Sequence, residues 1–190
     1  MTAPTDHYTK VAIALHWIIG ISIILLLALG LTMEDFPQSM RFAAFQFHKS
    51  LGLTVLILSF VRLFWRLTHR PPALAEGMAP WEKFAAHAVH FALYALMIGL
   101  PLTGWALVSS SPRGIPTIWF GLFEWPHLPV LNAVENKEEV SHSFGEVHES
   151  LAWIAITLIA LHIGAALKHH IIVKDNTLTR MLPFLKPPSA

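Results

Sequence analysis

The sequence lacks cysteine and has little charge. None of its 190 residues is a cysteine, which excludes disulfides, iron–sulfur clusters, cysteine-based zinc sites and covalent attachment of haem. Only 13% of the residues are charged, about half of the roughly 25% typical of a soluble domain. Together with 54% hydrophobic residues, this excludes a disordered chain and an ordinary soluble globule. The net charge of +1 and the lack of a dominant basic stripe argue against a nucleic-acid partner.

Four apolar segments are long enough to cross a bilayer, which takes roughly 20 helical residues. They cover about residues 11–31, 47–67, 84–108 and 147–173. We do not expect the first to be a signal peptide, because it is too long, contains His16 and Trp17, and lacks a small-residue cleavage site. The sequence therefore predicts an all-α, integral-membrane four-helix bundle, with residues 1–190 forming a single membrane domain in the lipid bilayer.

The distribution of lysine and arginine predicts the orientation of the bundle. With the N-terminus inside, the inner segments hold nine lysines and arginines and the outer segments hold four, so we expect both termini in the cytoplasm. The long outer segment, residues 109–146, contains Trp119, Phe120, Phe123 and Trp125. Such rings favour the headgroup layer. We expect an interfacial cap there, and a ligand pocket is the alternative.

Four of the twelve histidines lie at paired depths. His148 and His162 are 14 residues apart, about 21 Å along a helix but only about 40° around it. One face of the fourth span thus carries an imidazole toward each side of the membrane. His48 lies at the depth of His148, and His16 at the depth of His162. Ionisable groups inside a membrane are costly and usually functional. Two facing pairs suit two bis-histidine haems stacked across the bilayer.

The neighbours of these four histidines leave room for a flat cofactor. The residue four positions after each of them is small, namely Gly20, Gly52, Ala152 and Ala166. His87 and His90, which open the third span, are followed at the same spacing by the large Phe91 and Tyr94. Zinc is the other interpretation of clustered histidines. However, zinc prefers four ligands at one centre, whereas these histidines come in twos, without cysteine and with almost no carboxylates in the spans.

Haem propionates are anionic and need cations nearby. Lys49 follows His48 directly, which predicts that it lies at the outer haem. Arg62 comes 14 residues after His48 and therefore points roughly toward the inner haem from the second span. It either pairs with an inner propionate or extends to the inner surface, since Arg66 follows one turn later.

Several short motifs carry a resemblance to a known family. They are His16-Trp17, His48-Lys49-Ser50-Leu51-Gly52, Val61-Arg62-Leu63, His87-Ala88-Val89-His90, Leu100-Pro101-Leu102-Thr103-Gly104, His148-Glu149 and Leu161-His162. The most specific stretch is Lys168-His169-His170 followed by Lys174-Asp175-Asn176-Thr177-Leu178. On these motifs the chain resembles the prokaryotic cytochrome b561 family, which are four-helix di-haem cytochromes b of the bacterial inner membrane. The resemblance covers nearly the whole chain.

The resemblance implies two non-covalent haems b, one held by His16 and His162 on the inner side and one by His48 and His148 on the outer side. It also implies transmembrane electron transfer linked to the quinone pool, with ubiquinone as substrate. Near the inner haem, hydrogen-bond donors could hold a quinone carbonyl and supply a proton, and these are His169, His170, Lys174 and Arg180. A basic stop signal on the inner side is the alternative interpretation of this segment.

Three other functions stay open. Some members of the family oxidise superoxide outside and reduce ubiquinone, and others are cytochrome subunits that exchange electrons with a partner redox protein. A third possibility is a metal-binding or assembly protein without haem. Several acids crowd the outer end, namely Glu135, Glu138, Glu139, Glu146 and Glu149. Superoxide is an anion and its fast capture favours a positive approach, whereas an acidic face suits a basic periplasmic redox protein.

Overall fold

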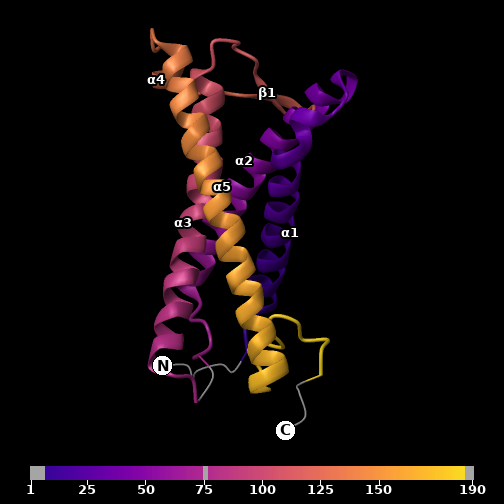
Figure 1. The fold of residues 1–190 in the computed structure, drawn as a ribbon, viewed down its shortest axis with the longest axis vertical. Helices are drawn as coiled ribbons and strands as arrows, with labels where there is room; N and C mark the ends of the chain where they lie inside the picture. The colour runs from indigo at the N-terminus through magenta and orange to yellow at the C-terminus, as the bar shows by residue number, and fades with distance from the viewer. Residues whose placement is uncertain (1–6, 75–76, 187–190) are drawn as a thin grey trace.

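The chain folds as four long helices that stand side by side (Figure 1). The computed structural model describes residues 7–74 and 77–186. Its long helices are α1 (Lys10–Thr32), α2 (Gln38–Thr68), α3 (Pro80–Ser110) and α5 (Lys137–Lys168). All four are long and apolar enough to cross a membrane. The prediction of an all-α, four-helix membrane bundle is confirmed.

Three of these helices are longer than the bilayer core is thick. Helices α2 and α3 have 31 residues each and α5 has 32, which corresponds to about 46–48 Å against a hydrocarbon core of about 30 Å. Accordingly, α2 begins at Gln38 and α5 at Lys137, well before the apolar segments that start near residues 47 and 147. The helix ends therefore extend into the headgroup layers, where polar side chains can be solvated.

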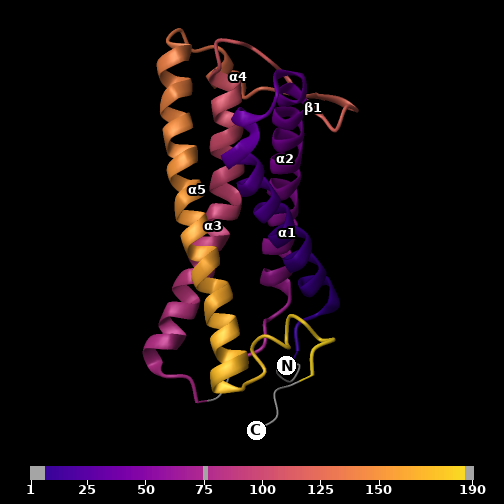
Figure 2. The ribbon, with the colours of Figure 1, turned by 45° about the vertical axis from the view of Figure 1, so that its right-hand side comes forward.

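The bundle is built from two helix pairs. Helix α1 packs on α2, α3 packs on α5, and the contact of α2 with α3 joins the pairs, as Figure 2 shows. The apolar core lies between α1 and α2, where Leu15, Ile19 and Leu26 meet Val55. Many other apolar side chains of α1 point outward. A bilayer solvates such outward-facing side chains, so the helices need only a narrow packed core.

The beginnings of α1 and α3 and the ends of α2 and α5 meet at the bottom of Figure 1, which we call the lower end. Side chains from distant parts of the sequence link the elements there. The indole of Trp65 donates to Thr9 Oγ1 over 2.9 Å, and the ammonium of Lys168 lies 2.6 Å from Glu82 Oε1. Below α5, a short π-helical turn, η2 (His169–Val173), ends at Lys174, whose φ of 60° is left-handed. The chain thereby turns back beneath the bundle.

The upper end contains elements that periodicity does not predict. A 3-10 turn, η1 (Met33–Asp35), joins α1 to α2, and a short helix, α4 (Pro129–Asn132), precedes α5. Between α3 and α4, strands β1 (Thr117–Trp119) and β2 (Phe123–Trp125) form an antiparallel hairpin in which Trp119 is paired with Phe123. Three residues lie between this pair, and two of them, Phe120 and Gly121, have positive φ, the backbone twist that type I′ turns use to match a hairpin.

Polar side chains of α2 satisfy the backbone of this hairpin. Gln46 Nε2 and Lys49 Nζ both donate to the carbonyl of Pro116 over 2.9 Å, and Gln46 Oε1 accepts from the amide of Ile118. The hydroxyl of Ser50, which is fully buried, accepts from the amide of Phe120 over 3.1 Å. Because backbone polar groups near lipid need partners within the protein, these bonds hold the aromatic hairpin against α2.

We expect Ser50→Ala to destabilise the upper end. The substitution leaves the Phe120 amide without its buried acceptor, and such a loss costs about 1–3 kcal/mol. Ser143→Ala is the matched control, because the Ser143 hydroxyl is exposed and bonds only to the Glu139 carbonyl of its own helix. Thermal unfolding in detergent, combined with limited proteolysis of residues 111–127, measures the difference. Equal midpoints and equal cleavage rates for the two variants would contradict the role assigned to Ser50.

Candidate functional site

The upper pair of histidines faces across the bundle. His48 on α2 and His148 on α5 have their ring centroids 6.3 Å apart, with the ring planes at 72°. Both side chains are half-buried. The fold thus brings together two residues that are 100 positions apart in the chain, as their similar depth in the membrane predicts.

The lower pair has a similar separation, with a third histidine beside it. His16 on α1 and His162 on α5 have ring centroids 6.1 Å apart. His90 on α3 lies 5.4 Å from His162 by the same measure. The large Tyr94, four residues after His90, argues against a ligand role for His90 at the level of the sequence. The depth of His90, three turns into α3 from the lower end, is the signal that places it near His162.

The spacing within each pair fits an iron atom between the rings. A metal–imidazole bond is about 2.0 Å long, and Nε2 lies about 1.1 Å from the ring centre. Two imidazoles on one iron therefore have centroids about 6.2 Å apart. The observed 6.1 and 6.3 Å agree with this value, whereas the 5.4 Å between His90 and His162 is shorter. The geometry favours His16 over His90 as the partner of His162.

The carbonyl of Leu100 fixes the tautomer of His148. It lies 3.0 Å from His148 Nδ1, and because a carbonyl only accepts, Nδ1 must carry the hydrogen. The lone pair of Nε2 is then free for a metal, which is the usual arrangement of a metal-bound histidine. The hydroxyl of Thr103 also donates to the Leu100 carbonyl, over 2.9 Å.

Two glycines make room for the upper pair. A Cβ on Gly104 would lie 3.2 Å from Cε1 of His148, and one on Gly30 would lie 3.4 Å from Cε1 of His48. The motif Leu100-Pro101-Leu102-Thr103-Gly104 is thus the surface of α3 against which His148 rests. Nδ1 of His48 is buried and has no hydrogen-bond partner among the described residues. A buried polar nitrogen without a partner is uncommon in a folded protein, and coordination of His48 through Nε2 would leave this Nδ1 unsatisfied.

Arg62 lies at the lower pair. Its Nη2 is 3.4 Å from His16 Nδ1, and its Nη1 donates to the carbonyl of Ala12 over 3.2 Å. Its guanidinium also lies 5.7 Å from the ring centroid of Tyr94. The structure thus places Arg62 beside the lower histidines, as its spacing from His48 suggests. Lys49, in contrast, donates to Pro116 in the loop before the hairpin, so its ammonium already has a partner in the chain.

The four donors expected at a quinone divide into two groups. His169 is buried, and its Nδ1 lies 2.6 Å from Asp175 Oδ2, while Arg180 donates to the carbonyl of Ala73. These two hold the segment after α5 in place. Lys174 ends the π turn, and Nδ1 of His170 is buried without a hydrogen-bond partner in the described part of the chain. Nε of Arg180 is also buried without a partner among the described residues, but the guanidinium is already held by Ala73. His170 is therefore the one of the four that has a buried side-chain nitrogen and no side-chain bond to the described residues around it.

Two further contacts of the segment after α5 are not predicted from the sequence. The indole of Trp17, next to His16, donates to the carbonyl of Met181 over 2.7 Å. Asp175 accepts a second bond, from the amide of Thr177, over 2.8 Å. Although burial raises the pKa of the Asp175 carboxyl, the hydrogen bonds from Thr177 and His169 outweigh it, so the pKa lies below the usual value. This segment thus closes over the end of α1 that carries His16.

Comparison with known proteins identifies the class to which this fold and site belong. The family described as prokaryotic cytochrome b561 matches residues 7–184. Cytochrome b561 homolog 2 of Escherichia coli K12 is 32% identical over 183 residues, which cover 95% of this chain and 94% of that protein. Cytochrome b561 homolog 1 of the same organism is 32% identical over 180 residues, covering 94% and 98%. A protein named probable superoxide oxidase CybB, from Yersinia pestis, is 31% identical over 177 residues, covering 93% and 96%.

The chain belongs to the prokaryotic cytochrome b561 family. It is a multi-pass membrane protein of electron transfer, and membership of this family implies binding of haem b. Haem b, the cofactor that this family implies, agrees with the spacing of the two histidine pairs.

We expect Gly104→Ala to weaken haem binding at the upper pair. The added methyl would lie 3.2 Å from the His148 ring, so the ring must shift by a few tenths of an ångström and lose its bond to Leu100. Gly99→Ala is the matched control on the same helix, because its Cβ would lie 4.0 Å from Leu151. The measurement is the haem-to-chain ratio after purification. Full haem content with an unchanged spectrum in the Gly104 variant would refute this steric role.

We expect Asp175→Asn to lower the stability of the lower end by about 1–2 kcal/mol at neutral pH, because it removes a charged acceptor of two hydrogen bonds. The folded pKa of Asp175 is depressed, so its contribution is fully present above the unfolded value of about 3.9. It is lost as the pH falls through the lower folded pKa. Thermal midpoints of wild type and variant should therefore differ at pH 7, begin to approach each other below about pH 4, and coincide only below the depressed folded pKa. The exposed Asp35→Asn serves as control, and a gap that persists in acid would contradict the assignment.

Proposed function

We propose that this chain binds two haems b, one between His48 and His148 and the other between His16 and His162, and transfers electrons across the membrane. The observation that carries the proposal is that each histidine pair has the spacing of two imidazoles on one iron, 6.3 and 6.1 Å. When bound, the haems supply one-electron oxidation and reduction. His148 and His162 share one face of α5 about 21 Å apart along its axis, so a single helix sets the separation of the two sites.

Protein groups around each pair prepare it for a charged cofactor. The Leu100 carbonyl keeps His148 in the tautomer that binds iron through Nε2. Arg62, which reaches His16 from α2, supplies the positive charge that a propionate of the lower haem needs. We assign Lys49 to the upper propionates, and this role requires its ammonium to contact both Pro116 and the cofactor.

We further propose that the lower end faces the cytoplasm of a bacterial inner membrane and exchanges electrons with ubiquinone. The excess of lysine and arginine in the segments at that end supports the orientation. His170, with an unused buried nitrogen, is the candidate to hydrogen-bond a quinone carbonyl. His169, Lys174 and Arg180 are the other three donors of this proposal. His169 and Arg180 contribute by holding in place the segment that carries His170.

Two sources of electrons at the upper end are compatible with this arrangement. The relative named probable superoxide oxidase favours superoxide. However, Glu146 and Glu149 flank His148 in the sequence, and His142 lies 3.7 Å from Glu146 on the exposed face of α5. An acidic approach disfavours an anionic reductant and suits a basic redox protein. We therefore prefer a periplasmic protein partner and take superoxide as the second candidate.

Haem content of single variants tests the assignment of ligands. Purified wild type should contain two haems b per chain. His16→Ala and His162→Ala should lose the same haem, and His48→Ala and His148→Ala should lose the other. His90→Ala should retain both, as should His87→Ala, in which an exposed imidazole bonded to the Lys83 carbonyl is removed.

Reduced-minus-oxidised spectra and electron paramagnetic resonance of each variant distinguish the two haems. Loss of a haem in the His90 variant, with retention in the His16 variant, would reassign the lower ligand. A colourless wild type would reject the proposal and favour a metal-binding or assembly protein. Adding superoxide to the oxidised wild type then separates the electron sources, because only the superoxide mechanism predicts rapid haem reduction without a partner protein.

A further inference from the structure

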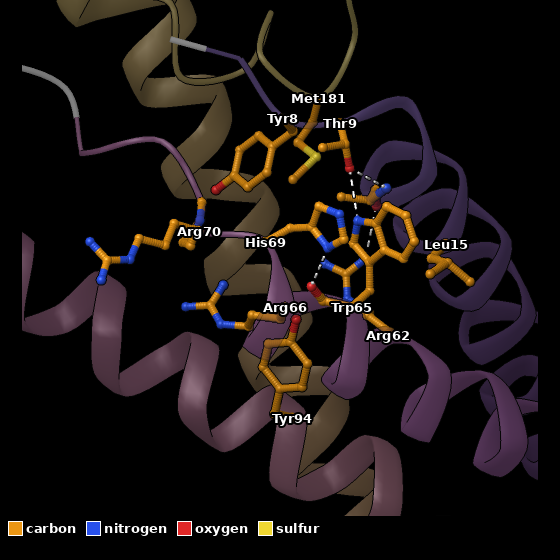
Figure 3. A pocket seen from close by; sticks show the side chains of 12 residues that line it. Tyr8, Thr9, Leu15, Arg62, Trp65, Arg66, His69, Arg70, Tyr94 and Met181 are labelled. Carbon is orange, nitrogen blue, oxygen red and sulfur yellow. Dashed lines mark hydrogen bonds between the residues drawn. The ribbon is translucent and has the colours of Figure 1, made fainter. Parts of the chain in front are cut away.

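A basic pocket opens at the lower end of the bundle, between the start of α1, the end of α2 and the loop after it (Figure 3). Its empty space, including the part open to solvent, is about 430 Å³. Three arginines line it. Arg62 and Arg66 lie one turn apart on α2, and Arg70 lies in the loop that follows the end of the helix at Thr68. None of the twelve residues that line this pocket is acidic.

The three guanidiniums do not have equal access to a ligand. Arg62 is held by Ala12 and His16 deep in the pocket. Arg66 and Arg70 have exposed side chains, and neither forms a hydrogen bond or an ion pair through its guanidinium within the described residues. Figure 3 shows both extending in the same direction, away from Trp65, with the hydroxyl of Tyr8 on the same side. Two cations and one hydroxyl donor therefore point toward one region.

The frame around these donors is well fixed. The ring of His69 stacks on Trp65 with centroids 3.9 Å apart and planes at 4°, and the Trp65 indole is bonded to Thr9. Tyr94 presents its ring to both Arg62 and Arg66, whose guanidinium carbons lie 5.7 and 5.5 Å from its centroid. The walls of the pocket therefore need little ordering when a ligand binds, and the main entropic cost is that of fixing the side chains of Arg66 and Arg70.

The chemistry of the pocket selects an oxyanion at the membrane surface. Guanidinium groups bind phosphate through paired N–H donors. The three arginines of this pocket repel one another and have no carboxylate among the lining residues, so a bound anion would stabilise them. Arg66 follows Arg62 by about 6 Å along α2, and Arg70 comes after the end of the helix at Thr68. The two free arginines are therefore nearer the headgroups than the lower histidines are. Anionic lipids attract such basic positions, and Leu15, Pro71 and Met181 provide apolar walls for the glycerol region.

We propose that Arg66, Arg70 and Tyr8 bind the phosphate of an anionic phospholipid in the leaflet at the lower end of the bundle. This site lies outside the two histidine pairs, and it requires the membrane bundle but neither the haem assignment nor the quinone.

Lipid-dependent stability of the haem-loaded protein tests the proposal. In a neutral detergent, added phosphatidylglycerol should raise the thermal midpoint of the wild type by roughly 5 °C at saturation, and phosphatidylcholine should not. The double variant Arg66→Gln/Arg70→Gln should lose most of this rise while retaining its haem content and spectrum. Arg113→Gln, which removes an exposed arginine before the hairpin, is the matched control and should respond like the wild type.

Other outcomes would overturn the lipid site. An equal rise with phosphatidylcholine excludes recognition of the anionic headgroup, and an equal rise with inorganic phosphate alone indicates a soluble anion instead. Loss of one haem from the double variant would show that these arginines hold a propionate. If the double variant is not recovered folded, Arg70→Gln at the exposed rim provides the same comparison, and an undiminished response to phosphatidylglycerol would reject the site.

Discussion

Polar groups inside a bilayer have no water to bind, and this bundle satisfies them with side chains from neighbouring helices. The carbonyl of Leu100 binds His148, and the hydroxyl of Ser50 binds the amide of Phe120. Pro101 in the middle of α3 removes an amide that the Met97 carbonyl would otherwise receive, and the hydroxyl of Ser59 lies 3.3 Å from that carbonyl. Each of these bonds joins two elements, so satisfying the backbone also fixes how the helices are placed around the histidines.

The two histidine pairs meet this constraint differently. At the upper pair, α3 supports His148 through Leu100 and Thr103 and leaves room through Gly104. At the lower pair, the supporting group is a cation, because Arg62 contacts both the carbonyl of Ala12 and the ring of His16. The upper site is therefore shaped by neutral backbone groups and the lower site by a charge.

The sequence alone predicted the features that depend on one helix at a time. Apolar windows of about 20 residues are a strong signal, so the four-helix membrane bundle was predicted and is confirmed. The shared face of His148 and His162 follows from helical periodicity alone. The hairpin was not foreseen, because strands of three residues are too short to show alternation. The approach of His90 to His162 depends on how α3 packs on α5, and the His169–Asp175 bond depends on a π turn. The depth of His90 along α3 is visible in the sequence, but the packing angle that turns it toward His162 and the π turn have no reliable sequence signal.

The lower end of the bundle depends both on the individual helices and on the contacts between them. Bonds from Trp65 to Thr9, from Trp17 to Met181 and from Lys168 to Glu82 tie the ends of all four helices together there. The same frame encloses the lower histidines and the basic pocket. Arg62 and Tyr94 belong to both, since Arg62 reaches His16 and Tyr94 faces Arg62 and Arg66 alike. A positive charge beside a redox centre favours its reduced state, so an anion bound at Arg66 would oppose that effect on the haem that we propose for the lower pair. The charge balance of this end is thus set jointly by the residues around His16 and by what the pocket holds.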